Sequence, residues 1–510
     1  MKLQNLIEGV PVLAAQGDLG IEINGVTADS RQAQAGSLFV AVPGFIHDGV
    51  RFVDGAIERG AAAIVAEAPP FGEAAFVRTD DARTALAVIA SNFYGHPAGK
   101  FKLIGVTGTS GKTTTTKMIE SVLDATGDPV GMIGTIEYRA GQERITADRT
   151  TPDAVVLQEW LARMAAADVR YAVMEVSSHA LVLRRTWGVR FAAAVFTNLS
   201  RDHFDFHHSF EEYFAAKRML FDQIDRTAKT AVVNIDDPYG RRLAADLGDA
   251  VISFGISDAA DIRPAGQFRN DIDGLNGVVR TPWGDCQVNS ALVGTPNLYN
   301  WLGAIGACGA AGIGVEAMER GIRDLKTVRG RFERVGNGDA TVLVDYAHKP
   351  DALEKLLGAV RGLSGERRIV LVFGCGGDRD AGKRPLMGEI AGRLADLTIL
   401  TSDNPRGEDP ERILDEVEKG LSAVPAARYE RIADRRAAIE RAMVEAEAQS
   451  VVVIAGKGHE NYQVIGDQII HFDDREEAEF ALQKLSTKTT DTIRNDSATR
   501  TRTESMAKKS

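Results

Sequence analysis

The sequence is poor in cysteine and has no long hydrophobic run. Its three cysteines, Cys286, Cys308 and Cys375, are widely separated in a chain of 510 residues. That spacing argues against a disulfide framework or a zinc site and indicates a reducing compartment. No stretch approaches the apolar length of a membrane span, and the first residues lack the apolar core of a secretion signal. We therefore expect a cytoplasmic protein without membrane insertion.

Positive charge is also scarce. The 60 lysines and arginines are outnumbered by 71 aspartates and glutamates, which leaves a net charge of −11. Nonspecific nucleic-acid binding needs a basic surface, so we expect no nucleic-acid partner. Aromatic residues make up only 6% of the chain, yet apolar residues reach 44%, as in folded globular proteins. At this length we expect two to four domains rather than a single core.

The most informative segment is a glycine-rich turn between a predicted strand at 101–106 and a helix that begins with Lys-Thr-Thr. Backbone N–H groups in such a turn converge on an anion, and the helix N-terminus adds partial positive charge. Lys112 can reach the β- and γ-phosphates of a nucleotide, and the Thr113 hydroxyl can ligate Mg²⁺. The segment therefore predicts a nucleoside triphosphate site formed by Gly108, Thr109, Ser110, Gly111, Lys112, Thr113 and Thr114.

This turn departs from the usual phosphate-loop pattern at one position. Val106 stands where the pattern has its first glycine, and Gly105 and Gly108 lie nearby instead. The alternative interpretation is a tight strand-to-helix turn with a capping hydroxyl. The two glycines, the Gly-Lys-Thr triplet and the preceding strand together favour the phosphate site.

Apolar segments alternate with helical patterns along most of the chain, which indicates parallel sheets covered by helices. Buried strands are expected at 172–176, 193–197, 230–234, 341–344, 368–373, 397–401 and 451–455. We predict an α/β protein of three domains. These are a small N-terminal α/β domain at 1–98, a central P-loop parallel-sheet domain at 99–328 and a Rossmann-like domain at 329–486. The segment 487–510 has almost no apolar residues and is expected to be disordered.

Polar side chains follow the predicted strands of the central domain, where parallel sheets place their sites. Glu175 can ligate the Mg²⁺ that accompanies a triphosphate, although an exposed loop carboxylate is the alternative. His203 follows the next strand and can act as a metal ligand or proton carrier, although a lone histidine is more often structural. Lys217, taken by itself, is typical of a solvated helix charge.

Four predicted strands of the C-terminal domain also end in charged side chains. Asp345, Arg379, Arg406 and Glu460 each follow one of these strands. Arginines bind carboxylates, and acidic groups bind an ammonium. Each signal is weak alone, but together they predict a site for a small zwitterion.

The chain resembles the Mur ligase family, ATP-dependent amide-forming enzymes of peptidoglycan precursor synthesis. The resemblance covers about residues 20–485 and rests on five segments in family order, at 107–114, 175–179, 197–203, 296–300 and 345–348. Within the family the chain is similar to the members that extend UDP-N-acetylmuramoyl-L-alanyl-D-glutamate by the third stem-peptide residue. The form that selects meso-2,6-diaminopimelate carries the tetrad found here as Asp403, Asn404, Pro405 and Arg406.

The resemblance implies a role for each matching position. The UDP moiety is expected at Ser30, Phe45, Ile46 and His47. The muramoyl-peptide is expected at Thr150, Thr151, Ser177 and Arg185. The Mg²⁺ ligands are expected to be Thr113, Glu175, His203 and Lys217 as its carbamate. Further ATP contacts are expected from Asn297, Asn300, Arg331 and Asp345. The amino acid is expected at Arg379, the 403–406 tetrad, Gly456 and Glu460.

The implied chemistry joins a carboxylate to an amine through an acyl phosphate, with ATP and Mg²⁺ as cofactors. The catalytic residues would be Lys112, His203, Lys217 and Arg331. The substrates would be UDP-MurNAc-dipeptide and meso-diaminopimelate, and we expect a monomer. The extra carboxylate of diaminopimelate gives Arg379 and Arg406 a group that lysine lacks.

The sequence departs from the family pattern at one position, and several alternative functions stay open. Leu183 stands where the family often carries a glutamine that contacts the peptide. The alternatives are the lysine-adding ligase, a folylpolyglutamate or cyanophycin synthetase, a non-catalytic sensor and a switch GTPase. The tetrad and the segment 29–31 disfavour the synthetases, and no Asn-Lys-x-Asp guanine-binding motif is present. A sensor could lose Lys112, Glu175, His203 and Lys217, yet all four are present.

Overall fold

The computed structural model describes residues 1–44, 47–69, 74–204, 206–271, 273–336, 340–446 and 450–485. The chain divides into two compact units, which are described separately. The first contains Met1–Phe268, Asn276–Asn289 and Asn297–Asp324. The second contains Arg269–Leu275, Ser290–Pro296 and the residues from Leu325 onward. Within the described residues, no helix is both long enough and apolar enough to cross a membrane.

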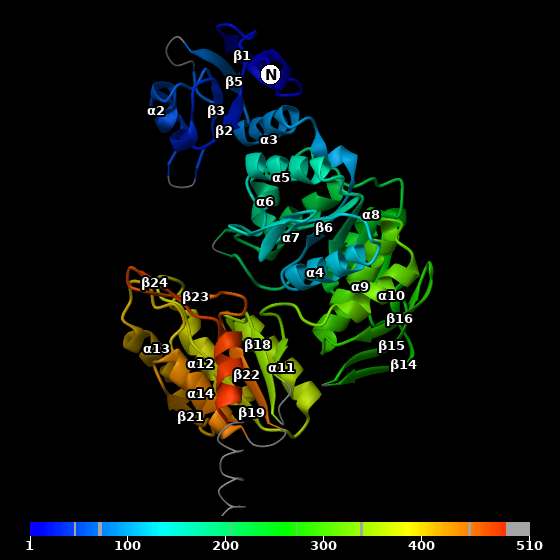
Figure 1. Ribbon diagram of the computed structural model, residues 1–510, viewed down its shortest axis with the longest axis vertical. Coiled ribbons are helices and arrows are strands. Elements are labelled where there is room, and N and C mark those ends of the chain that lie inside the picture. Colours follow the sequence, from blue (N-terminus) through cyan, green and yellow to red (C-terminus); the bar gives the residue numbers. More distant parts are fainter. Residues whose placement is uncertain are drawn as a thin grey trace, which may run out of the picture. The chain divides into compact units, whose positions relative to one another are not determined.

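The N-terminal part of the first unit is built on a five-stranded sheet in the order β1-β5-β4-β3-β2 (Figure 1). Its strands are β1 (Val12–Gln16), β2 (Gly25–Thr27), β3 (Ser37–Ala41), β4 (Ala63–Ala66) and β5 (Ala75–Thr79). Its helices are α1 (Leu3–Leu6), η1 (Ser30–Gln32), η2 (Gly49–Phe52), α2 (Val53–Glu58) and α3 (Ala82–Phe93). Only β1 runs antiparallel to its neighbour, while β2 to β5 are parallel.

The central sheet has eight strands in the order β13-β12-β11-β6-β10-β7-β8-β9. The strands are β6 (Lys102–Thr107), β7 (Val130–Ile133), β8 (Glu137–Ala140), β9 (Glu143–Thr146), β10 (Tyr171–Glu175), β11 (Ala193–Phe196), β12 (Ala231–Asn234) and β13 (Val251–Phe254). Six of them pair in parallel. The expected parallel sheet is thus confirmed, and the sequence interpretation missed the antiparallel strands β8 and β9. These two form a hairpin whose turn contains Gly141 at φ +60°, a conformation that glycine adopts at low cost.

Helices flank this sheet and continue the first unit (Figure 1). They are η3 (Pro97–Lys100), α4 (Lys112–Asp124), α5 (Ala154–Ala166), α6 (Ser178–Val182), α7 (Phe210–Arg218), η4 (Met219–Asp222), α8 (Pro238–Leu247), η5 (Gly248–Ala250), α9 (Thr295–Ala310) and α10 (Val315–Asp324). A separate three-stranded sheet is formed by β14 (Arg263–Asp271), β15 (Gly274–Thr281) and β16 (Gly284–Ser290). The core under α5 joins Trp160 and Leu161 to Ala172 and Met174 of β10. Strands covered on both faces are continuous apolar runs, which explains why the sequence identified them.

The second unit contains a six-stranded sheet in the order β17-β18-β22-β19-β20-β21. The strands are β17 (Glu333–Val335), β18 (Thr341–Asp345), β19 (Ile369–Phe373), β20 (Leu397–Leu400), β21 (Tyr429–Arg431) and β22 (Val451–Ala455). Helices α11 (Pro350–Ser364), α12 (Lys383–Leu394), α13 (Pro410–Ser422) and α14 (Arg435–Glu445) alternate with them. A hairpin of β23 (Tyr462–Ile465) and β24 (Gln468–His471) follows. The α/β fold class is confirmed, whereas the domain boundaries at 98 and 328 stay predictions.

Seven of the α-helices that the structure describes begin after a side chain that accepts backbone N–H bonds. The capping residues are Asp81 for α3, Asp153 for α5, Ser177 for α6, Ser209 for α7, Asp237 for α8, Asp409 for α13 and Asp434 for α14. Helix α4 differs, because its first residue follows Gly111 and no side chain caps it. The first amides of α4 are therefore not used by a capping side chain.

Candidate active site

The glycine-rich turn lies at the carboxyl end of β6, and β6 pairs with β11 on one side and β10 on the other. The ends of these three strands therefore lie next to one another. The Thr109 amide donates to Asn198 O at 2.9 Å, and the Ser110 amide donates to Asn198 Oδ1 at 3.0 Å. The segment after β11 thus holds the turn in place, as the adjacency of predicted strand ends implied.

Two glycines of the turn have backbone conformations that exclude a side chain. Gly108 has φ +149° and Gly111 has φ +87°. A Cβ at Gly108 would collide with Thr197 Oγ1, and a Cβ at Gly111 would collide with Asn300 Oδ1. The turn therefore keeps a bare backbone that an anion can approach closely.

Both predicted lysines of this site reach the same carbonyl. Lys112 Nζ donates to Gly108 O and Thr109 O at 3.0 Å each, and Lys217 Nζ donates to Gly108 O at 2.7 Å. Lys217 is only 1% exposed, so the solvated helix charge suggested by its local sequence is not what the structure shows. Burial, with the nearby Lys112 charge, lowers the pKa of Lys217 well below its usual value.

Glu175 is fully buried at the end of β10, and its carboxylate accepts hydrogen bonds from two threonines. Its Oε2 accepts from Thr113 Oγ1 at 2.9 Å and from Thr135 Oγ1 at 3.1 Å, and its Oε1 accepts from the Thr135 amide at 2.7 Å. Thr150 Oγ1 lies 3.1 Å from Thr135 Oγ1. The alternative of an exposed loop carboxylate is therefore wrong for Glu175.

Four residues predicted to contact the muramoyl-peptide gather beside Glu175. Thr151 Oγ1 donates to Glu175 O at 2.8 Å and accepts from the Ser177 amide at 3.1 Å. Arg185 Nη1 donates to Thr151 O at 2.8 Å. Leu183, at the position of the usual glutamine, ends α6 and offers no polar side-chain group. The structure thus brings Thr150, Thr151, Ser177 and Arg185 together, although it does not test their roles.

His203 belongs to a cluster of histidines rather than standing alone. Its ring centroid lies 4.7 Å from that of His179, which in turn lies 5.7 Å from that of His207. His203 Nε2 is 3.4 Å from Asp202 Oδ2, and its side chain is 38% exposed. His207 Nε2 is 3.0 Å from Ser178 Oγ. The sequence analysis did not select His179 or His207 as site residues, although both follow the same two strands as Glu175 and His203 and His179 ends the family segment 175–179.

Asn297 and Asn300, predicted for ATP, are buried on α9 beside the start of α4. Asn300 Nδ2 donates to Asn297 Oδ1 at 3.3 Å, and Thr115 Oγ1 donates to Asn300 Oδ1 at 3.3 Å. Asn300 therefore lies against the turn at Gly111, and the role of the pair in ATP binding stays a prediction.

The residues predicted for the UDP moiety lie in the N-terminal sheet region. Ser30 begins η1 behind the capping carboxylate of Asp29, and the His47 and Phe52 rings are 6.2 Å apart. Phe45 and Ile46 lie outside the described residues.

A second cluster lies at the strand ends of the second unit. The Asp345 carboxylate accepts from the Phe332 amide at 2.7 Å and from the Ala347 amide at 2.9 Å. Burial raises the pKa of Asp345. The Arg331 guanidinium carbon lies 4.7 Å from the Tyr346 ring centroid, and Arg331 Nε is buried without a hydrogen-bond partner among the residues that the structure describes. Such an unsatisfied donor favours binding of an acceptor from a ligand.

Strands β18, β22, β19 and β20 are consecutive in their sheet, so the four predicted strand ends are neighbours. The 403–406 tetrad follows β20 and is held by β23. Asn404 Oδ1 accepts from the Val464 amide at 3.0 Å, and Gln463 Nε2 donates to Asp403 O at 2.6 Å. Asn404 Nδ2 donates to Glu460 Oε2 at 2.9 Å. The sequence analysis missed this hairpin, because a short exposed strand pair carries little periodic signal.

Arg406 has φ +53°, an uncommon conformation for a residue with a side chain. Its amide donates to Val464 O at 3.0 Å, its carbonyl accepts from the Gly466 amide at 2.8 Å, and its Nη1 donates to Gly377 O at 2.8 Å. The hairpin therefore fixes the backbone that presents the Arg406 guanidinium.

Two other residues predicted for the amino acid lie on neighbouring loops. Arg379 is exposed on the loop after β19. Gly456 has φ +119°, and a Cβ there would press on Asp403 Oδ2.

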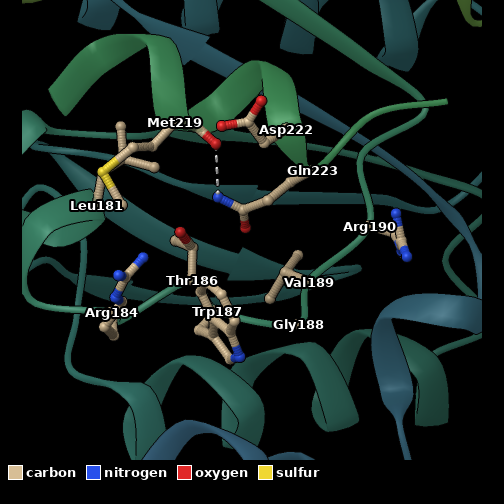
Figure 2. A pocket seen from close by; sticks show the side chains of 10 residues that line it. All are labelled: Leu181, Arg184, Thr186, Trp187, Gly188, Val189, Arg190, Met219, Asp222 and Gln223. Atoms are coloured by element: carbon tan, nitrogen blue, oxygen red, sulfur yellow. Dashed lines mark hydrogen bonds between the residues drawn. The ribbon is translucent and has the colours of Figure 1, made fainter. Parts of the chain in front are cut away.

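A cavity of about 650 Å³ in the first unit involves other residues (Figure 2). Gln223 Nε2 donates to Met219 O at 3.3 Å, and Gln223 Oε1 is buried without a hydrogen-bond partner. The cavity is lined by Leu181, Arg184, Thr186, Trp187, Gly188, Val189, Arg190, Met219, Asp222 and Gln223. None of these residues was predicted for ATP, Mg²⁺ or the muramoyl-peptide, so the cavity is not the predicted site.

The residues present fit a Mg-nucleotide. The turn that a Cβ would fill, the uncapped start of α4 and Lys112 suit a chain of phosphates. The Thr113 hydroxyl and the Glu175 carboxylate are hard oxygen ligands, which suit Mg²⁺ completed by water and phosphate oxygens. Within the described residues, no group of three or more His, Cys, Asp or Glu side chains forms a metal site. The donor set therefore suits Mg²⁺ bound together with phosphate rather than a metal enclosed by protein.

Comparison with known proteins identifies the family. Residues 22–94 match "Mur ligase family, catalytic domain", residues 106–308 match "Mur ligase middle domain" and residues 330–458 match "Mur ligase, glutamate ligase domain". The chain belongs to the Mur ligase family. This confirms the resemblance that the sequence motifs indicated.

The names of individual similar proteins are more specific than the family. The chain is 44% identical to the UDP-N-acetylmuramoyl-L-alanyl-D-glutamate--2,6-diaminopimelate ligase of Geobacter metallireducens, over 96% of this chain and 99% of that protein. It is 48% identical to the enzyme of the same name from Gloeobacter violaceus, over 91% and 94%. A solved structure of a ligase of that name superposes with a TM-score of 0.69 at 32% identity, covering 95% of this chain and 99% of the other. The MurF ligase of Thermotoga maritima, with a TM-score of 0.59 and 19% identity, shares the fold.

Proposed function

We propose that this protein is the ATP-dependent ligase that adds meso-2,6-diaminopimelate to UDP-N-acetylmuramoyl-L-alanyl-D-glutamate, with release of ADP and phosphate. The observation that carries the proposal is a chain-long relation to ligases of that name, at 44% identity over 96% of the chain. The 403–406 tetrad supports the same amino acid, because the guanidinium of Arg406 would bind a second carboxylate. We propose a cytoplasmic monomer.

Binding of the nucleotide rests on the turn after β6. The backbone amides of the turn and Lys112 would hold the β- and γ-phosphates, and Thr113 with Glu175 would hold Mg²⁺. When bound, Mg²⁺ offsets the repulsion between the triphosphate and an attacking carboxylate. Asn297 and Asn300 line the start of α4 and would contact the nucleotide, with Arg331 and Asp345 as further contacts.

The reaction begins when the D-glutamate γ-carboxylate attacks the γ-phosphorus. An oxygen–phosphorus bond forms as the bond from the γ-phosphorus to ADP breaks, which gives an acyl phosphate. Thr150, Thr151, Ser177 and Arg185 lie next to Glu175, so they would orient the carboxylate beside the phosphate turn. Lys112 would stabilise the charge that develops on the phosphoryl oxygens.

In the second step the amine of diaminopimelate attacks the acyl carbon, a carbon–nitrogen bond forms and phosphate leaves. The attacking amine must first lose a proton. His203 is half-exposed beside Asp202 and is our candidate for accepting it. Glu460 and Asp403 would bind the ammonium at the far end of the amino acid, and Arg406 and Arg379 would bind its carboxylate.

Lys217 is proposed to act as a carbamate. Burial lowers its pKa, and a neutral amine can add to CO₂ with loss of one proton. The product exchanges a cation for an anion beside Gly108, where it would support a second Mg²⁺. This explains how a lysine serves in a site of acidic ligands.

The deciding assay measures phosphate release from ATP with UDP-MurNAc-L-Ala-D-Glu and either meso-diaminopimelate or L-lysine. We expect turnover with diaminopimelate and little with lysine. Equal turnover would refute the amino-acid assignment and favour a ligase that accepts lysine. No turnover with either would refute the ligase function and favour a sensor. Glutamate added to a folate would test the folylpolyglutamate alternative.

A further inference from the structure

One lysine in the second unit is fully buried among the residues that the proposed function assigns to the amino acid. Lys457 follows β22 and is 0% exposed. Its Nζ donates to Asn404 Oδ1 at 3.2 Å and lies 3.7 Å from Asp403 Oδ1 and 3.6 Å from Glu460 Oε2. Neither the family resemblance nor the strand-end pattern selected this residue.

The three partners of Lys457 come from two different segments. Asp403 and Asn404 follow β20, whereas Glu460 lies between β22 and β23. Asn404 uses both ends of its amide within the protein, because Nδ2 donates to Glu460 Oε2 at 2.9 Å while Oδ1 accepts from Lys457 and Val464. Lys457 lies in the same segment as Glu460, and its ammonium, like the amide of Asn404, contacts both segments.

Charge explains why a cation is needed at this point. The Asp403 side chain is 8% exposed and that of Glu460 is 19% exposed, so two carboxylates are largely withdrawn from water. Among Asp403, Glu460 and Lys457, two carboxylates against one ammonium leave one negative charge in excess. The only one of these groups with appreciable access to solvent is Glu460, which can therefore present that charge to the ammonium of a ligand.

Other charged and titratable groups also lie near these carboxylates. Lys383, whose Nζ donates to His348 O at 2.8 Å, interacts electrostatically with Asp403. Arg435 on α14 pairs with Asp474 through two bonds of 2.7 Å, so these two groups neutralise each other. Tyr346 Oη lies 3.4 Å from Glu460 Oε1, and the Tyr462 ring centroid lies 5.6 Å from Lys457 Nζ. Tyr346 and Tyr462 are neutral phenols, whose pKa values burial raises further.

We propose that Lys457 is a positioning residue for amino-acid specificity: as the internal counter-ion, it keeps Glu460 ionised and locked to Asn404, so that the pocket recognises the substrate ammonium. This inference rests on the proposed function. It assigns Lys457 no contact with substrate, since its three neighbours enclose the Nζ group.

The direction of the pKa shifts agrees with this role. Burial and the Asp403 charge raise the pKa of Glu460, and the Lys457 charge opposes that rise. Removal of the lysine charge should therefore raise the Glu460 pKa further. Glu460 would then be protonated over a wider range of acidic pH, where it cannot attract an ammonium.

The test compares Lys457→Gln and Lys457→Met with the wild type. Lys457→Gln retains a hydrogen-bond donor for Asn404 but has no charge. We expect KM for meso-diaminopimelate to rise about tenfold or more in both variants, with KM for ATP and for the UDP-MurNAc-dipeptide nearly unchanged. The acid limb of kcat/KM for diaminopimelate should move to higher pH. Lys484→Met, which removes a lysine paired with Glu440 at 2.9 Å on the surface of the same unit, is the matched control.

A second comparison isolates the path through Glu460. Because Lys457 acts on that carboxylate, Lys457→Gln in a Glu460→Gln background should add little further loss. The inference is overturned if Lys457→Gln leaves the acid limb in place, or if it weakens all three substrates equally. Should Lys457→Met fail to fold by thermal melting, Lys457→Gln decides the question. A wild type inactive with diaminopimelate would instead refute the proposed function itself.

Discussion

The Thr113 hydroxyl donates a 2.9 Å hydrogen bond to the buried Glu175 carboxylate. The two residues come from α4 and β10, which are 62 positions apart in the chain. This contact joins the glycine-rich turn to a neighbouring strand end and places side by side the two oxygen atoms that we propose as Mg²⁺ ligands. The contribution of the Glu175 carboxylate to Mg²⁺-dependent activity can be measured by replacing it with the isosteric glutamine.

Glu175→Gln should abolish most of the Mg²⁺-dependent activity, because the amide replaces the anionic ligand while retaining its shape. We expect kcat to fall about 100-fold or more and the Mg²⁺ concentration for half-maximal rate to rise. Phosphate release titrated with Mg²⁺ measures both. Glu159→Gln, which disrupts a surface pair with Arg163, is the control. An unchanged Mg²⁺ titration in Glu175→Gln would exclude Glu175 as a metal ligand.

Gly108→Ala should prevent nucleotide binding. The added Cβ would collide with Thr197 Oγ1 in a backbone with φ +149°. Gly95→Ala is a matched control, because Gly95 also has positive φ, at +69°, but nothing lies within 4 Å of an added Cβ. The control should lose about 1 kcal/mol of stability and keep its ATP affinity. Calorimetric titration with an ATP analogue measures the affinity of both variants. If Gly108→Ala bound the analogue as tightly as the wild type, this turn would not be the phosphate site.

Arg406→Lys should weaken the amino acid specifically. Lysine keeps the charge but loses the planar fork that binds a carboxylate through two hydrogen bonds. We expect KM for meso-diaminopimelate to rise roughly 10- to 100-fold while KM for ATP stays constant. Exposed Arg412, replaced in the same way, provides the control on the neighbouring helix α13. If both variants matched the wild type, the distal carboxylate would have to be bound elsewhere.

Stability of the second unit should decline on mild acidification. Burial lowers the pKa of His348 and of His459 to about 4, from an ordinary value of 6.5. At these two histidines the unfolded chain therefore binds more protons than the folded chain between these values, so their contribution to the free energy of unfolding falls as pH drops from 6.5 to 4. Urea unfolding followed across this range measures the slope. His348→Gln should flatten it, whereas an unaltered slope would show that His348 does not contribute.

The sequence by itself determined which segments are buried strands and which segment is the predicted phosphate site. Strands such as β6, β10 and β22 are covered on both faces, so they are continuous apolar runs that can be read without a structure. The glycines and Lys112 of the phosphate turn could also be predicted from the sequence, because their proposed roles follow from local backbone geometry. The family resemblance could be identified from the sequence because its motifs are short contiguous segments.

Only the tertiary structure decided which side chains are withdrawn from water and which partners they meet. Lys217 has the local sequence of a surface lysine, yet it is 1% exposed against Gly108. Lys457 and the β23–β24 hairpin were not selected at all, because their contacts with Asn404 join residues more than 50 positions apart. Burial and long-range pairing depend on how the strands are ordered in the sheets, and no local pattern encodes that order.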